Sequence, residues 1–68
     1  MAEALDNRIR EAREAKGWTQ AQLAERIGVS RKTVNTVENG VFVPSTVIAL
    51  KLARALGEPV EGLFTLIE

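Results

Sequence analysis

The sequence contains no cysteine and no histidine, and aromatic residues make up only 4% of it. The absence of cysteine excludes disulfides, and the absence of both residues excludes an ordinary zinc site and any nucleophile activated by histidine. No apolar run approaches the roughly 20 residues that span a bilayer, and no basic segment followed by an apolar stretch marks export. We therefore expect a cytoplasmic protein that does not associate with membranes and binds no metal and no cofactor.

Neither sign of charge prevails, because nine lysine and arginine residues balance nine aspartate and glutamate residues. A neutral chain argues against a nucleic-acid partner, but its charges are unevenly distributed. Residues 8 to 32 carry seven cations and three anions, a net charge of +4, which leaves −4 on the remainder. Such a molecule can turn a basic face toward phosphate. The alternative is that these charges only solvate helix surfaces.

With 68 residues, the chain is predicted to form one domain, residues 1–68. A chain of this length buries only about 60% of its unfolded surface, so its core is thin. Stability must then come from aliphatic packing, from good helix formers or from a partner subunit. The small volume leaves little room for a substrate pocket, and the sequence has no phosphate-binding GxxxxGK[ST] loop. We therefore predict that the protein is not an enzyme.

Hydroxyl residues and glycines divide the middle of the chain into two short helices joined by a turn. Thr19 and Gln22 are spaced as a capping box at the start of one helix, and Ser30 can cap the next. Gly28 ends the first of these helices because glycine tolerates positive φ, and the second ends at Gly40. Apolar residues at helical spacing then face a shared core: Leu23, Ala24, Ile27, Val34 and Val37.

Three further helices are predicted outside this pair. One begins near residue 4 or 6 and ends at Lys16, another runs from its cap Ser45 to Leu56, and a short one spans residues 59–64. Residues 64–67 then form either an extended tail or a continuation of that last helix. The pattern requires no strand, although the chain ends could be extended. We predict an all-α, compact domain of five helices.

Together these segments resemble the lambda-repressor-like, Cro-like helix-turn-helix family, also called the xenobiotic response element family. The resemblance covers nearly the whole chain and is carried by residues 8–20 (RIREAREAKGWTQ), 29–34 (VSRKTV), 38–40 (ENG), 44–45 (PS), 53–57 (ARALG) and 63–64 (LF). It implies a helix-turn-helix at residues 19–39 in a sequence-specific transcriptional regulator, most simply a repressor. It also implies binding to double-stranded operator DNA as a homodimer, with the third helix in the major groove.

The resemblance assigns DNA contacts to individual residues. Base contacts fall on the third helix, at Arg31, Lys32, Asn35 and Thr36. Arginine or lysine can pair with guanine, and asparagine with adenine. Phosphate contacts fall on six residues: Arg10, Thr19, Gln20, Ser30, Asn39 and Ser45. As alternatives, Lys32 could reach a phosphate, and Gln20, Asn39 and Ser45 could serve only as first-turn or capping residues.

The resemblance also implies a structural ion pair. The family joins the arginine found here as Arg13 to the glutamate found here as Glu38 in a partly buried salt bridge between helices one and three. Trp18 is expected in the core rather than in a ligand stack. The chain departs from the family at residues 41–43, where Val-Phe-Val replaces the usual lysine and polar residue. We expect Phe42 to fold back onto the core.

The apolar residues that remain after the core is assigned cluster near the C-terminal end: Val60, Leu63, Phe64, Leu66 and Ile67. An exposed apolar patch implies a partner, and relatives in the family dimerise through this region. Dimerisation there would let two copies read half-sites about 34 Å apart. The alternative is that this tail covers the monomer's own core.

A protein-interaction module, such as an antitoxin-like partner that has kept the fold without DNA binding, is the rival for the whole chain. Gln20, Arg31 and Lys32 are predicted to lie on one face. Their presence argues against that rival, because fold stability does not require them.

Overall fold

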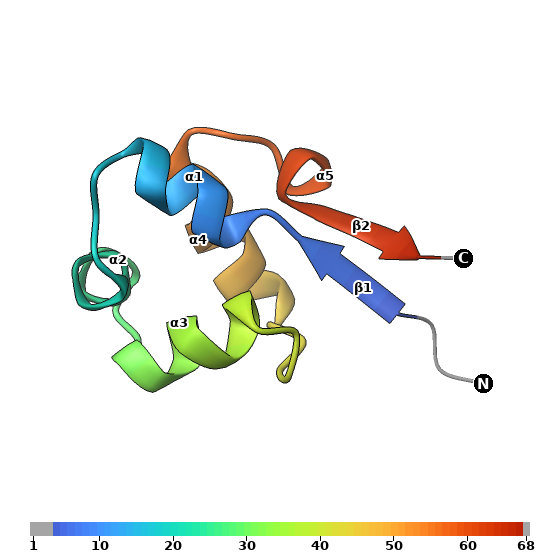
Figure 1. Ribbon diagram of the computed structural model, residues 1–68, viewed down its shortest axis with the longest axis horizontal. Coiled ribbons are helices and arrows are strands. Elements are labelled where there is room, and N and C mark those ends of the chain that lie inside the picture. The colour runs from blue at the N-terminus through green and yellow to red at the C-terminus, as the bar shows by residue number, and fades with distance from the viewer. Residues whose placement is uncertain (1–3, 68) are drawn as a thin grey trace.

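A computed structural model describes residues 4–67. Over this range the structure contains five helices and two strands (Figure 1). In chain order they are β1 (Ala4–Asn7), α1 (Ile9–Ala15), α2 (Gln20–Ile27), α3 (Arg31–Glu38), α4 (Thr46–Leu56), α5 (Val60–Leu63) and β2 (Phe64–Ile67). The helices pack around one core, and the strands extend from one end of the helical bundle as a ribbon. No helix in the described range is long and apolar enough to cross a membrane.

The turn between α2 and α3 forms as the sequence predicts. Thr19 Oγ1 accepts the backbone N–H of Gln22 at 3.1 Å, and the Gln22 side chain accepts the backbone N–H of Thr19 at 2.8 Å. Gly28 ends α2 with φ of +72°, a conformation that residues with a Cβ rarely adopt. Ser30 Oγ then accepts the backbone N–H of Thr33 at 3.1 Å and caps α3. The chain therefore turns from α2 into α3 within residues 28–30.

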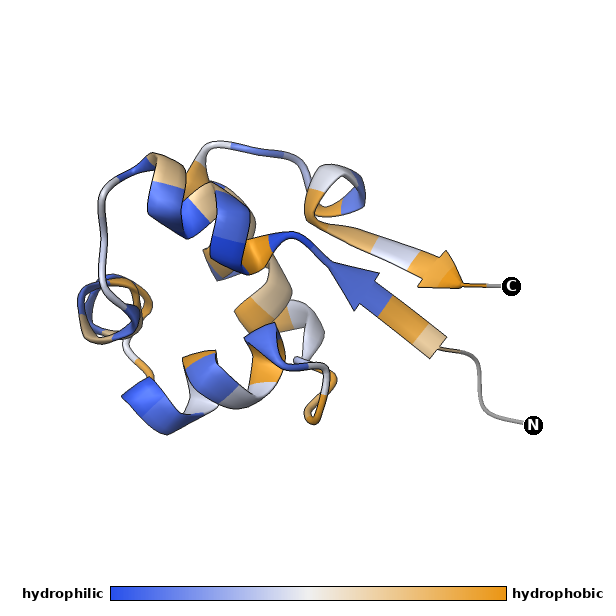
Figure 2. Ribbon diagram, viewed as in Figure 1, coloured by the Kyte–Doolittle hydropathy of each residue, from blue (hydrophilic) through white to orange (hydrophobic). Residues whose placement is uncertain are grey.

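One apolar face of each helix builds the core. The largest fully buried side chains come from all five helices: Ile9, Leu23, Val34, Leu52 and Leu63. Figure 2 shows hydrophilic and hydrophobic residues alternating along α1 and α3, as expected for helices with one buried face. Because each helix contributes to the same cluster, the position of α3 is fixed by the whole domain.

The chain ends differ from the all-α prediction, because β1 and β2 form a two-stranded antiparallel sheet. Ala4 pairs with Ile67 and Asn7 pairs with Phe64. The segment from Phe64 to Ile67 is therefore the extended tail, the first of the two predicted alternatives. The prediction that the first helix begins at residue 4 or 6 is wrong, since α1 begins at Ile9.

Hydrogen bonds made by Asn7 and Arg8 explain why α1 begins at Ile9 and not earlier in the chain. Asn7 Oδ1 accepts the backbone N–H of Ile9 at 3.1 Å, and Asn7 Nδ2 donates to the carbonyl of Val37 at 2.9 Å. The backbone N–H of Arg8 donates to the carbonyl of Leu63 at 2.9 Å. These bonds hold the segment extended beside β2, so tertiary pairing decides its conformation.

The loop between α3 and α4 also differs from expectation. Phe42 does not fold onto the core; it is 44% exposed, while Val41 and Val43 are 78% and 67% exposed. The backbone N–H groups of Val41 and Phe42 both donate to the carbonyl of Thr36, at 2.9 and 3.2 Å. This turn holds the loop against the end of α3 and leaves its apolar side chains outside the core.

Candidate nucleic-acid interface

The first turn of α3 carries two exposed cations. Arg31 and Lys32 are both exposed, and neither forms an ion pair within residues 4–67. Helix electrostatics do not explain them, because the N-terminal end of a helix carries partial positive charge and disfavours cations. The start of α3 is therefore a positive surface without a compensating anion in the described part of the chain.

Asn35 and Thr36 lie one turn further along α3, and both are half-buried. The Asn35 amide is held on both sides, since its Nδ2 donates to Gln20 Oε1 and its Oδ1 accepts from Asn39 Nδ2, each at 3.3 Å. The Thr36 hydroxyl donates to backbone carbonyls of its own helix at 3.0 Å. The amide is thus oriented before any ligand arrives, whereas Thr36 has its methyl group free for contact.

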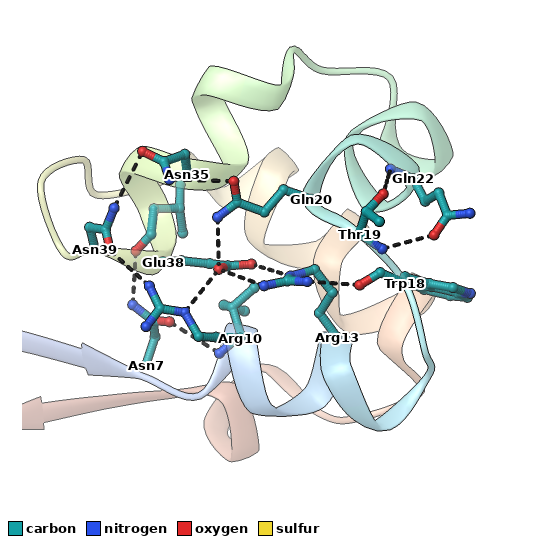
Figure 3. A network of polar contacts seen from close by, with 12 residues as sticks. Asn7, Arg10, Arg13, Trp18, Thr19, Gln20, Gln22, Asn35, Glu38 and Asn39 are labelled. Carbon is teal, nitrogen blue, oxygen red and sulfur yellow. Dashed lines mark hydrogen bonds and ion pairs between the residues drawn. The ribbon is translucent and has the colours of Figure 1, made fainter.

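A buried carboxylate joins three helices behind this face (Figure 3). Arg13 of α1 donates to Glu38 of α3 through Nε at 2.7 Å and through Nη2 at 3.2 Å. Gln20 of α2 and Arg10 of α1 donate to the same carboxylate at 3.1 and 3.4 Å. The Glu38 side chain is 0% exposed and that of Arg13 is 11% exposed. The structure therefore contains the expected Arg13–Glu38 pair, and the pair fixes α1 against α3.

The ionisation of Glu38 reflects this environment. Burial alone would raise its pKa, but the hydrogen bonds from Arg13 and Gln20 outweigh burial, and the net pKa lies below the ordinary value of 4.5. The hydrogen bond to Glu38 likewise raises the pKa of the Arg13 guanidinium. Both groups are therefore charged at neutral pH, and each compensates the other.

The residues assigned to phosphate contacts lie in two settings. Arg10, Gln20 and Asn39 belong to the network around Glu38, and Arg10 Nη2 donates to Asn39 Oδ1 at 2.9 Å. The Arg10 side chain is nevertheless 51% exposed and can reach outward. The other three residues are N-caps whose side chains accept a backbone N–H of their own helix: Thr19, Ser30 and Ser45.

The part of the chain that forms the helices matches the model of a known protein family. A family model described as Helix-turn-helix matches residues 9–63, which is most of the chain. The chain belongs to the helix-turn-helix family. The lambda-repressor-like, Cro-like resemblance is thereby confirmed. This family consists of transcriptional regulators without enzymatic activity, as the sequence predicts.

Two relatives of this helix-turn-helix protein match it over most of their own length. An uncharacterized HTH-type transcriptional regulator from Methanothermobacter thermautotrophicus is 49% identical over 61 residues, which cover 88% of each chain. The uncharacterized HTH-type transcriptional regulator YgzD from Bacillus subtilis is 39% identical over 64 residues, covering 94% of this chain and 97% of YgzD. The solved restriction-modification controller protein C.AhdI from Aeromonas hydrophila has a TM-score of 0.75 at 42% identity, covering 79% of this chain and 82% of that chain. Sequence and fold therefore agree on the family.

The residues predicted to form the dimer interface do not share one surface. Leu63 is 1% exposed and belongs to the core, so its assignment to the interface is wrong; it is the buried side chain that anchors the short α5. Val60 and Phe64 are half-buried, whereas Leu66 and Ile67 are 57% and 52% exposed. Because successive side chains of a strand point to opposite faces, Leu66 and Ile67 lie on opposite faces of the ribbon.

One face of the ribbon adjoins a groove of about 510 Å³ beside α4, hereafter the α4–ribbon groove. Its lining residues are mostly apolar: Leu5, Pro44, Thr46, Ala49, Leu50, Val60, Glu61 and Phe64. Leu66 pairs with Leu5 across the sheet and so shares this face. Figure 1 shows the ribbon at the end of the molecule away from the first turn of α3. An apolar surface therefore exists apart from the cationic one.

Sequence reasoning missed the role of Asn7, which ties the ribbon to α3, although asparagine is known to accept the backbone N–H two residues later in an Asx-turn, as Asn7 does from Ile9. Trp18 is half-buried against the core, as expected, and the Arg26 guanidinium lies 4.1 Å from the centre of its ring. That cation–π contact was not predicted.

Within residues 4–67, no cluster of three or more acidic, histidine or cysteine side chains could hold a metal.

Proposed function

We propose that this protein is a sequence-specific transcriptional regulator, most simply a repressor, that binds duplex operator DNA as a homodimer with α3 in the major groove. The observation that carries the proposal is that Arg31 and Lys32, at the start of α3, form no ion pair within residues 4–67, although the helix dipole disfavours cations there. A duplex supplies the missing anions, with one phosphate charge per about 1.7 Å of helix axis. Family membership and the names of the relatives agree with this proposal.

Base readout is assigned to four residues of α3. Arg31 and Lys32 are exposed and can each donate to guanine O6 and N7. Asn35 can recognise adenine through its amide, and the bonds from Gln20 and Asn39 hold that amide in one orientation. Thr36 can offer its methyl group, because its hydroxyl donates to its own helix.

Phosphate contacts are assigned to residues that flank α3. Arg10, Gln20 and Asn39 would grip one part of the backbone while remaining connected to Glu38. The capping hydroxyls of Thr19, Ser30 and Ser45 lie at helix N-termini, where backbone N–H groups also favour an anion. Contacts of this kind set the orientation of a protein on DNA without reading its sequence.

The DNA proposal is tested by selecting a binding site from random duplexes and then measuring Kd by fluorescence anisotropy. Arg31→Ala should weaken binding to the selected site by a factor of about 5 to 150 and relax preference at one or two base pairs. Arg54→Ala is the matched control, because Arg54 is an exposed arginine in the last turn of α4 and is not among the residues assigned to DNA contacts. Arg10→Ala should weaken binding to all DNA sequences by the same factor.

Two outcomes would contradict this assignment. Equal loss of specific and nonspecific binding in Arg31→Ala would show that Arg31 does not read bases. Failure of the wild type to bind any duplex would contradict the whole proposal and favour the protein-interaction module.

The homodimer is proposed to form through the α4–ribbon groove and the ribbon face that continues it. Leu50, Val60 and Phe64 line the groove, and Leu66 lies beside it. Leu50 and Leu66 are each 57% exposed. Exposed apolar side chains that cluster in this way indicate a protein partner. A second copy can cover them while both α3 helices face one side of the duplex. Ile67 lies on the other ribbon face and is left out of the proposed interface.

Sedimentation velocity of two matched variants tests the interface. Leu66→Asp should yield a folded monomer that binds a half-site weakly, because dimerisation would bury an unpaired charge. Ile67→Asp makes the same kind of change at the neighbouring, equally exposed position and should stay dimeric. A dimeric Leu66→Asp variant, or equal disruption by both variants, would place the interface elsewhere.

Repression is the simplest outcome of these two surfaces. A dimer that occupies an operator can exclude another protein from it, which requires a DNA face and a dimer face and no further contact. A reporter with the selected site overlapping its promoter should therefore be silenced, and the same reporter with the site moved upstream should not. Stimulation from the upstream position would indicate an activator instead.

A further inference from the structure

Three exposed apolar side chains lie beside the helix that we propose to read DNA. Val41, Phe42 and Val43 follow α3, and the carbonyl of Thr36 holds the loop in place by accepting two of its N–H groups. Figure 2 shows the hydrophobic tip of this loop on the same side of the molecule as the outer face of α3. The core does not use these side chains, and a phosphate contact would need donors instead.

A shallow hollow of about 340 Å³ lies where this loop meets α3. Its lining residues are Lys32, Thr33, Thr36, Val41 and Phe42, and none of them is acidic. The Thr36 hydroxyl is directed at backbone carbonyls, so its methyl group is free to contact a ligand. The hollow thus combines apolar walls with one cation at its rim.

We propose that this hollow receives the 5-methyl group of a thymine, so that Val41 and Phe42 determine sequence specificity together with α3. The inference rests on the proposed placement of α3 in the major groove. The cation at the rim suits a polyanion, and the thymine methyl is the one alkyl group that base edges present in that groove. Apolar side chains, including Thr methyl and Phe, are known partners of this methyl.

The size of the effect follows from the burial of one methyl group. Removing one such group from water corresponds to about a fourfold gain in affinity. This gain in affinity is small compared with that of a bidentate arginine contact, but it is confined to one base position. A measurement that changes only the methyl group can therefore detect it.

Replacement of thymine by uracil makes that change. A binding site is first selected from random duplexes with the wild type, and each thymine is then replaced in turn by uracil. Anisotropy gives Kd for the wild type and for Val41→Ala, Phe42→Ala and Val43→Ala. Val43→Ala is the matched control, because Val43 is an exposed valine of the same loop that does not line the hollow.

We expect one thymine per half-site at which uracil weakens the wild type and Val43→Ala about fourfold. The same replacement should weaken Val41→Ala and Phe42→Ala less than twofold. Phe42 also lines a second pocket beside β1, so its variant is checked by circular dichroism. If that variant does not fold, Val41→Ala alone decides.

Several results would overturn the inference. They are a selected site without a preferred thymine, a wild type that is indifferent to uracil at every position, and a uracil penalty that persists in Val41→Ala. If the loop variants instead weaken binding to all sequences equally, the loop contacts the DNA backbone. A wild type that selects no duplex contradicts the DNA-binding proposal itself, whereas one that selects a site but ignores uracil contradicts only this inference.

Discussion

Replacing Glu38 with alanine tests how this small domain is held together. The change removes the acceptor of hydrogen bonds from Arg10, Arg13 and Gln20. Arg10 is half exposed and can turn to water. Arg13, whose side chain is 11% exposed, keeps only its 2.7 Å bond to the carbonyl of Trp18. The variant therefore leaves a guanidinium buried without a compensating charge.

The expected loss is large relative to the stability of the domain. Removing one partner of a buried pair costs about 3–5 kcal/mol. At about 0.05–0.15 kcal/mol per residue, a domain of 68 residues has a free energy of unfolding of roughly 3–10 kcal/mol. Replacing both partners with apolar residues, Arg13→Met with Glu38→Leu, should restore much of the loss because no charge stays buried.

Urea unfolding measures these differences. Trp18 is the single tryptophan and packs against the core, so its fluorescence reports unfolding, and circular dichroism supplies a second probe for two-state behaviour. Glu25→Ala is the matched control, since Glu25 is exposed on α2 and forms no ion pair within the described range. It should stay within about 0.5 kcal/mol of the wild type. A Glu38→Ala variant within about 1 kcal/mol of the wild type, and no less stable than the double variant, would refute the argument from buried charge.

Acid should destabilise the wild type more steeply than Glu38→Gln. Because the pKa of Glu38 is lowered in the fold, its stabilisation is present above the ordinary, unfolded pKa of 4.5 and is lost as pH falls through the lower folded pKa; equal slopes in urea titrations from neutral to acid pH would contradict this. Asn39→Ala releases one side of the Asn35 amide and also removes a proposed phosphate contact, so it should reduce discrimination for adenine in addition to overall affinity, as measured by Kd on matched sites with adenine and guanine; an adenine preference equal to that of the wild type would argue against the orienting role. Gly28→Ala should cost about 1 kcal/mol in urea unfolding from strain at φ of +72° alone, since a Cβ there would meet no atom within 4 Å; an unchanged midpoint would show that the turn relaxes.

The helix-turn-helix could be predicted from the sequence because its signals are local. Thr19 and Ser30 directly precede the first residues of α2 and α3, and Gly28 directly follows α2. Each signal acts within about one helical turn, so no knowledge of the fold is needed. The pairing of Arg13 with Glu38 is different, because 25 residues separate them. That contact came from the family resemblance.

The remaining features depend on contacts that no local pattern encodes. Residues 4–7 become a strand because β2, about sixty residues later, supplies the partner. Leu63 and Leu66 are both apolar and close in sequence, yet the docking of α5 buries Leu63 and leaves Leu66 exposed. Phe42 stays outside the core because Thr36 fixes the backbone of its loop. In each case the folded structure decides what the residue contacts.

A net charge of zero does not oppose the proposed DNA binding, because the charges are not equivalent once the chain has folded. Glu38 and Arg13 compensate each other in the interior and add little to the outer field. Arg31 and Lys32, in contrast, have no ion-pair partner in residues 4–67. The electrostatic potential that DNA would meet is therefore set by the charges at the start of α3 and not by the net charge of the whole chain. The same buried carboxylate that neutralises Arg13 holds Gln20, which orients Asn35, so the stability of the fold and the proposed recognition of DNA depend on one group.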